Sequence, residues 1–182
     1  VFEGDDDDDD LGPLLEELEI EPEKIQAKLK MIANPTAPGR QLLLEEADFW
    51  GPCAVVVTYA LLIVWGQMSV IGWILVLWIV GGWIAHFVAR ALGAEHLTYA
   101  AVLCVIGYSM TPLVLSSLFL GLIGLVTSRT WIKFLVQTLA ITWSSYSAGS
   151  LIVPANLPDK KLLVFYPVFL LFIYMMNLRA GV

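Results

Sequence analysis

Side chains that could do acid–base or metal chemistry are scarce in the apolar part of this chain. His86 and Arg90 lie four residues apart, about one helical turn, and a histidine so placed can move a proton or bind a metal. Both roles need a partner, and the five apolar stretches between Trp50 and Leu178 contain no Asp or Glu. Carriers that move protons and carboxylate hydrolases depend on such groups. We therefore expect no enzyme activity, no metal site and no cofactor.

The other residues that could bind a metal ion lack the spacing of a metal site. The aspartate run 5–10 could hold Ca²⁺ weakly, but it lacks the Gly and Glu spacing of an EF-hand, so a solvated acidic strip is the simpler interpretation. Cys53 and Cys104 lie in apolar segments without the spacing of a metal site. We expect both to be buried free thiols.

The most structured polar motif stands where the chain meets its first apolar stretch. It reads Asp48-Phe49-Trp50-Gly51-Pro52. Asp48 can cap a helix, Pro52 fits a first turn, and Trp50 suits a membrane interface. The motif is at least a device for entering the membrane. The exposed acidic group could also dock a partner, so Asp48 and Trp50 are candidate partner-binding residues.

A second motif lies inside the third apolar stretch. Gly107 allows another helix to approach closely, and Tyr108, Ser109 and Thr111 can bond the backbone groups that Pro112 frees. A packing kink is one interpretation of the motif. A cleft for a lipid or another ligand is the other.

The fourth apolar stretch is unusually polar for its length. Ser145 and Gly149 stand four residues apart and form a small-xxx-small face, in a segment that contains further hydroxyl side chains. Helix packing explains this pattern, and a polar transport path is the alternative.

The elements that must position these motifs fall into two regions of opposite charge. Residues 1–49 contain 15 of the 17 acidic groups and four of the ten basic ones, whereas residues 50–182 contain two acidic and six basic groups. The acidic arm excludes nucleic acid as a partner, because phosphates repel it. It favours a basic or otherwise complementary protein surface. Glu16 and Glu17 are its candidate contacts, set between leucines after Pro13.

The arm is expected to contain short helices. Ile25, Leu29 and Ile32 follow at i, i+4 and i+7 after Pro22 and form one apolar stripe. We therefore predict a helix that starts at Pro22 and ends before Pro35. The predicted domains are an arm over 1–48 and a membrane part over 49–182.

The membrane part is predicted to contain five transmembrane helices, so the fold class is all-α. A helix needs about 20 apolar residues to cross a bilayer. The expected spans are 50–68, 70–92, 97–126, 131–153 and 162–178. The third can be one helix kinked at Pro112 or two shorter pieces, and we favour one because 30 residues are too few for two full spans.

Charge predicts the orientation of these spans. With five spans, seven Lys and Arg residues lie on the side of the arm and three on the other side. The positive-inside rule then places the arm in the cytosol and the C-terminus in the lumen. The acidic start is unlike a cleavable signal peptide. The first residue is Val1, so we expect further residues upstream and expect the first span to direct its own insertion.

The order of motifs resembles one family of membrane proteins. GPLLEEL at 12–18, DFWGP at 48–52 and GYSMTP at 107–112 occur in order in a chain with five apolar stretches, and the last stretch contains LVFYPVFL at 163–170. Together they resemble the YIPF family, the Ypt/Rab-interacting proteins of Golgi and ER membranes. The family commonly has Leu followed by Tyr or Trp where this chain has Phe49 and Trp50, so the chain departs mildly from the motif at Phe49.

The resemblance implies a trafficking role. It implies a cytosolic N-terminus, residence in Golgi or ER membranes, a prenylated Rab-type GTPase as partner, pairing with another YIPF protein, and contact with membrane lipids. The motif positions carried over are Glu16, Glu17, Asp48, Trp50, Gly51, Pro52, Gly107, Tyr108 and Pro112. The expected function is an adaptor for ER–Golgi vesicle transport and Golgi organisation. A channel, carrier or lipid-scrambling subunit is the alternative.

Overall fold

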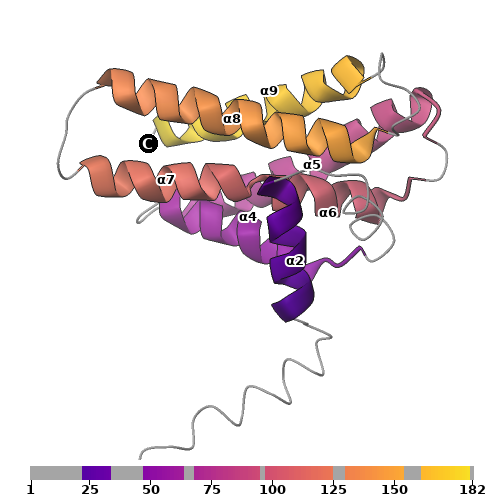
Figure 1. The fold of residues 1–182 in the computed structure, drawn as a ribbon, viewed down its shortest axis with the longest axis horizontal. Coiled ribbons are helices and arrows are strands. Elements are labelled where there is room, and N and C mark those ends of the chain that lie inside the picture. Colours follow the sequence, from indigo (N-terminus) through magenta and orange to yellow (C-terminus); the bar gives the residue numbers. More distant parts are fainter. Residues whose placement is uncertain are drawn as a thin grey trace, which may run out of the picture.

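The computed structural model of this chain is helical throughout the part that it describes (Figure 1). The described residues are 22–33, 47–63, 68–94, 97–124, 130–153 and 161–180. Their helices are α2 (Pro22–Ala33), α4 (Trp50–Ile63), α5 (Met68–Ala91), α6 (Tyr99–Ser109), α7 (Thr111–Gly124), α8 (Thr130–Ile152) and α9 (Lys161–Ala180). Strands are absent from these ranges, so the expected all-α class is confirmed for them.

Helices α4 to α9 form a bundle along one long axis (Figure 1). α8 packs on α9 and α7, α5 packs on α9 and α6, and α4 lies against α5, α6 and α7. α2 differs from the others because it lies across this axis, where it contacts α6 and α8 (Figure 1). The bundle therefore has a helix of the arm attached to its flank.

The interior of the bundle is closed by large side chains from four helices. Tyr59 of α4, Trp78 of α5, Tyr108 of α6 and Phe172 of α9 are fully buried. Other large apolar side chains point outward along the bundle, as expected where lipid rather than water surrounds the helices.

Two helical stretches among the described residues are long and apolar enough to cross a membrane. They are Val70–Ala91 and Tyr99–Leu122, and two shorter apolar helices cover Trp50–Ile63 and Leu162–Leu178. The expected span 50–68 corresponds to α4, which ends at Ile63, and residues 64–67 lie outside the described part. The count of five spans stays a prediction.

The third expected span is two helices joined by a single residue. Met110 separates α6 from α7, two residues before Pro112. Proline cannot donate the backbone hydrogen bond that the Tyr108 carbonyl would receive in a regular helix. The Thr111 hydroxyl donates to that carbonyl at 2.6 Å instead. Both pieces are counted in one candidate span, Tyr99–Leu122.

α5 ends in a tight turn. Gly93 has φ +99°, and the N–H groups of Gly93 and Ala94 donate to the carbonyls of Arg90 and Ala89. This pair of bonds is a Schellman C-cap, which needs a residue with positive φ and therefore favours glycine. Thr98 then caps α6 by accepting from the N–H of Ala101 at 3.3 Å. α5 and α6 run antiparallel, because His86 meets Tyr99 near one end and Trp78 meets Leu103 further along.

Candidate functional site

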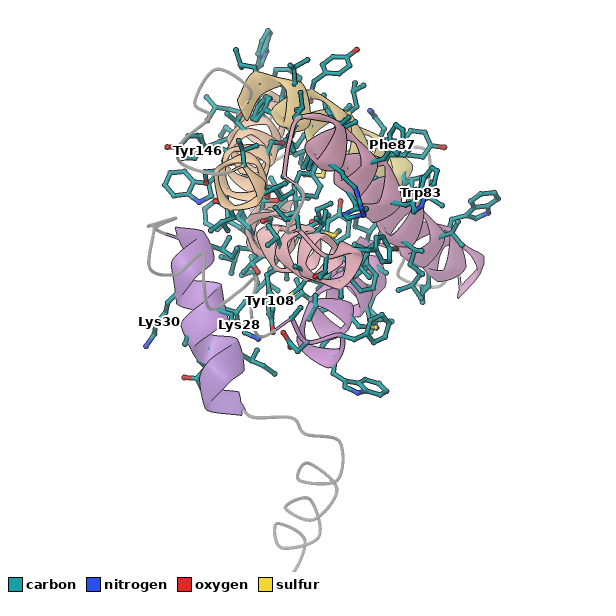
Figure 2. The ribbon with its side chains drawn as sticks, turned by 90° about the vertical axis from the view of Figure 1, so that its right-hand side faces the viewer. Lys28, Lys30, Trp83, Phe87, Tyr108 and Tyr146 are labelled. Atoms are coloured by element: carbon teal, nitrogen blue, oxygen red, sulfur yellow. The ribbon has the colours of Figure 1, made fainter. Side chains whose placement is uncertain are left out.

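Asp48 is the centre of the polar cluster that joins α2 to the bundle. Its Oδ1 accepts a hydrogen bond from Lys28 Nζ of α2 at 2.8 Å, and its Oδ2 accepts one from the Tyr108 hydroxyl of α6 at 2.8 Å. Lys28 and Tyr108 lie next to each other at this junction, whereas Lys30 points away from it (Figure 2). One carboxylate thus connects three segments that are far apart in the sequence.

The local sequence explains why Asp48 can serve two purposes. Its Oδ2 also accepts from the backbone N–H of Gly51 at 3.2 Å, three residues later. This is the bond of a helix N-cap, and it satisfies one of the free donors at the start of α4. The capping role expected for Asp48 is therefore present. The same cap fixes the carboxylate where Lys28 and Tyr108 reach it.

The ion pair between Lys28 and Asp48 is largely removed from water. The exposed fraction of the side chain is 3% for Lys28 and 32% for Asp48. Burial by itself would raise the pKa of Asp48, but hydrogen bonds from Lys28 and Tyr108 and the charge of Lys28 outweigh it. The pKa of this carboxyl therefore lies below its ordinary value of 3.8. Asp48 is ionised at neutral pH.

Cys104 is a further neighbour of this carboxylate. Its thiol is buried on α6 and donates to Asp48 Oδ1 at 3.5 Å. A thiol is a weak donor, so this contact adds little beside the bond from Lys28. Cys104 is the buried free thiol that we expected, whereas Cys53 is free but half-buried.

Two glycines of the predicted motifs allow the close packing around Asp48. A Cβ atom on Gly51 would collide with the Tyr108 hydroxyl, and one on Gly107 would collide with the ring of Pro52. The DFWGP and GYSMTP motifs therefore meet each other in space, with α4 lying against α6. Pro52 itself is buried.

The aromatic residues of the first motif point outward. Phe49 is 52% exposed and Trp50 is 53% exposed. The ring of Phe49 also lies 5.7 Å from that of Trp78, measured between centroids. Trp50 is thus accessible to lipid or to a partner, as its two candidate roles require.

α2 has a second attachment at its C-terminal end. The carbonyl of Ile32, which a helix leaves without an internal partner, accepts from the Ser147 hydroxyl at 2.9 Å and from Trp143 Nε1 at 3.4 Å. Ile32 is buried, and Ile25 and Leu29 pack partly buried against the core. The predicted apolar stripe therefore faces the bundle.

Sequence reasoning missed Lys28, Ser147 and Trp143 as parts of this cluster. A signal for Lys28 was present, because it is three residues after Ile25 and four before Ile32 and so shares their helical face. A lysine on an apolar face needs a buried acid. Nothing in the sequence could pair Ser147 with Ile32, since 115 residues separate them.

The remaining predicted positions lie elsewhere. Ser145 and Gly149 are buried on α8, where the nearest neighbour of a Cβ on Gly149 would be Phe165 of α9 at 3.7 Å. Pro112 is half-buried and lines neither of two surface cavities, one along α7 and one of about 320 Å³ between α8 and α9. Glu16, Glu17 and the run 5–10 lie outside the described residues.

Among the residues that the structure describes, His86 and Arg90 form no polar site together. Arg90 is exposed, and the half-buried His86 ring meets Tyr99 edge-on, with centroids 6.1 Å apart. Within the described ranges, no group of three or more His, Cys, Asp or Glu residues is placed to hold a metal ion.

Comparison with known proteins identifies the family. The Yip1 domain matches residues 29–178. Protein YIPF6 of Xenopus tropicalis is 26% identical over 147 residues, covering 71% of this chain and 60% of the relative. Protein YIPF6 of Danio rerio is 28% identical over 148 residues, covering 71% of this chain and 58% of the relative. The matched region thus spans about 60% of these relatives. No solved structure matches the chain.

The matched domain includes the whole polar cluster except Lys28, which lies one residue before it. The Yip1 domain and the long apolar helices together indicate an integral membrane protein. The chain belongs to the YIPF family of membrane proteins.

Proposed function

We propose that this protein is a membrane-anchored trafficking adaptor of the early secretory pathway. Its five spans hold it in Golgi or ER membranes with the acidic arm in the cytosol and the C-terminus in the lumen. The arm recruits a prenylated Rab-type GTPase, and the bundle pairs with another YIPF protein. Membership of the family supports a place in the secretory pathway. The adaptor is not an enzyme.

The observation that carries this proposal is the attachment of α2 to the bundle by Lys28 and Asp48. An adaptor must connect a cytosolic recruiting segment to its membrane anchor in a fixed arrangement. A buried ion pair is suited to this, because it specifies one arrangement even where it adds little net stability. The Ser147 hydroxyl on the Ile32 carbonyl fixes the other end of α2. The arm therefore leaves the bundle from a defined position.

The cluster divides the candidate partner-binding residues by role. Asp48 uses both carboxylate oxygens inside the chain, so its role is to position α2. Trp50 is exposed and is free to meet a partner or lipid. Glu16 and Glu17 remain the proposed contacts with the GTPase, since they precede the fixed helix.

Capture of a prenylated Golgi Rab-type GTPase by the full chain in mild detergent tests this function. Reversing both charges with E16K/E17K should reduce capture several-fold. The matched control is E45K/E46K, which makes the same change of net charge at another acidic pair of the arm. Equal capture by wild type and both variants would remove the arm from the mechanism.

The alternative is a channel, carrier or lipid-scrambling subunit built on the polar face of α8. Ser144 and Ser145 support it, because among the described residues their buried hydroxyls have no hydrogen-bond partner. Other hydroxyls of α8 oppose it, since Thr138 and Thr142 bond the preceding turn of the helix. Ion flux and lipid exchange in reconstituted vesicles separate the two functions. The adaptor should show neither.

A further inference from the structure

The depth of α2 along the bundle is fixed by its two attachments. Lys28 reaches Asp48, which bonds Tyr108, and Tyr108 lies nine residues after the start of α6, about 14 Å along the helix. Ile32 meets Ser147, five residues or about 8 Å before the end of α8. Because α2 also lies across the long axis (Figure 1), it lies nearer the middle of the bundle than the start of α6 and the end of α8 do. Along this axis, positions closer to the start of α6 are called higher.

The chemistry of α2 keeps it out of hydrocarbon. Gln26 and Lys30 are exposed on its outer face. A charged side chain in the bilayer interior costs about 3 kcal/mol or more, and the Lys28–Asp48 pair beside it would lose its remaining water. Water and lipid headgroups must therefore reach α2. On this flank the hydrocarbon boundary lies no higher than Tyr108.

The opposite flank of the bundle is apolar far beyond that level. Gly82 of α5 lies beside Leu103 of α6, with 3.8 Å from a Gly82 Cβ to the Leu103 Cα. Because the two helices are antiparallel, Phe87 lies about ten residues, or 15 Å, above the level of Tyr108. Phe87 is 65% exposed. Trp83 and Phe87 are on the side away from Lys28 and Lys30 (Figure 2).

This apolar face is continuous along α5. Its large exposed side chains are Trp73, Val76, Ile79, Val80, Trp83, Ile84 and Phe87. They belong to one candidate membrane span, of which 22% is buried in the bundle. The medium that surrounds the middle of this face should therefore also surround its upper end at Phe87. An exposed apolar face of this length does not suit water. α9 extends the face with exposed Leu162 and Leu163.

We propose that the leaflet on the side of α2 meets this protein at two heights about 15 Å apart. Lipid headgroups lie at α2, and on the opposite flank acyl chains extend as far as Phe87. The start of α4 fits this arrangement, because Gly51 and Pro52 lie against Tyr108 and Gly107, at the height of α2. The protein tilts in the bilayer or thins it beside α2 and α4. This surface does not depend on GTPase binding.

Spin-label accessibility in the full chain tests the proposal. Labels are placed one at a time at Gln26, Val76 and Phe87, each replaced by cysteine in a background without Cys53 and Cys104. The protein is reconstituted in phosphatidylcholine vesicles. Val76 is the matched control, because it is exposed at about the height of α2 but on the opposite flank. The ratio of oxygen to water-soluble nickel accessibility should be several-fold higher at 76 and 87 than at 26.

Three results would overturn it. Nickel access at 87 would show a flat boundary at the level of α2, and oxygen access at 26 would place α2 in hydrocarbon. A label at 87 shielded from both reagents would mean that a protein covers this face. Should the cysteine-free background not fold, wild-type protein can be labelled by phosphatidylcholine with a photoactivatable group on the part of its acyl chain near the headgroup. Labelling is then expected between Ile79 and Phe87 and absent from α2.

Discussion

Asp48 binds polar groups that lie in three separate segments of the sequence. Its carboxylate caps α4, neutralises Lys28 of α2 and holds the Tyr108 hydroxyl of α6. A single carboxylate with these three donors, and the weak donor Cys104 besides, leaves no simple replacement. Asparagine keeps one acceptor oxygen but loses the charge that Lys28 needs.

Removal of the Asp48 charge and removal of the Lys28 charge should destabilise the protein to different degrees. D48N removes the carboxylate charge that Lys28 Nζ meets at 2.8 Å and should lower the free energy of unfolding by about 3 kcal/mol. K28M should cost less, because Asp48 keeps Tyr108, Gly51 and its contact with water. The double variant K28M/D48N should recover part of the loss. Denaturant unfolding in detergent measures this cycle, and strictly additive losses would contradict a direct pair.

The lowered pKa of Asp48 gives the attachment a defined pH window. A carboxyl whose folded pKa lies below its ordinary value stabilises the fold above about pH 4, and that stability is lost as pH falls through the folded pKa. Docking of α2 should therefore be unchanged by Asp48 between pH 5 and 8 and weaken only in stronger acid. Energy transfer between labels on α2 and α8 measures docking. D48N should abolish this acid transition, so an equal transition in D48N would assign it to other groups.

At the scale of elements, the contact of α4 with α6 depends on the absence of a side chain at Gly107. G107A places a methyl group against Pro52 and beside Trp78, and such overpacking typically costs about 1–3 kcal/mol. G72A is the matched control, because nothing lies within 4 Å of a Cβ at that position on α5. Alanine there should be neutral or stabilising by up to about 1 kcal/mol. Thermal unfolding in detergent compares the two, and equal effects would contradict the packing role of Gly107.

The elements were largely predictable because their signals are local. The apolar stripe Ile25, Leu29 and Ile32 predicted α2, and Pro112 predicted the interruption near Met110. The meeting of the DFWGP and GYSMTP motifs was not predictable, because Gly107 indicates the close approach of another helix but not which helix that is. Lys28 shares the helical face of the apolar stripe, but the local sequence does not indicate which acid pairs with it. A buried ion pair between residues 20 apart needs the third segment, with Tyr108, to be in place.

At the scale of the whole molecule, five spans require the two ends of the membrane part to lie on opposite sides. An epitope tag before the arm should be stained after permeabilising the plasma membrane alone. A tag after Val182 should be stained only when internal membranes are also opened. Placing both tags on one chain makes each the control for the other. Staining of both tags under the first condition would mean an even number of spans.

The division into an arm over 1–48 and a membrane part over 49–182 stays a prediction, and side-chain contacts cross it. The boundary predicted at 48 separates Lys28 from Tyr108 and Ile32 from Ser147, although these residues bond each other. α2 is therefore attached to the bundle. The proposed contacts with the GTPase, Glu16 and Glu17, lie in the part of the arm before Pro22.

The double attachment of α2 has a mechanical consequence. A pull on the residues before Pro22, such as a tethered vesicle would exert, first loads the Lys28–Asp48 pair and the Ile32–Ser147 hydrogen bond. The tension is then shared among α4, α6 and α8 before it reaches the peptide chain that follows Ala33. A force applied to the arm would thus be distributed over the whole bundle, and a chain without Lys28 should yield at a lower force.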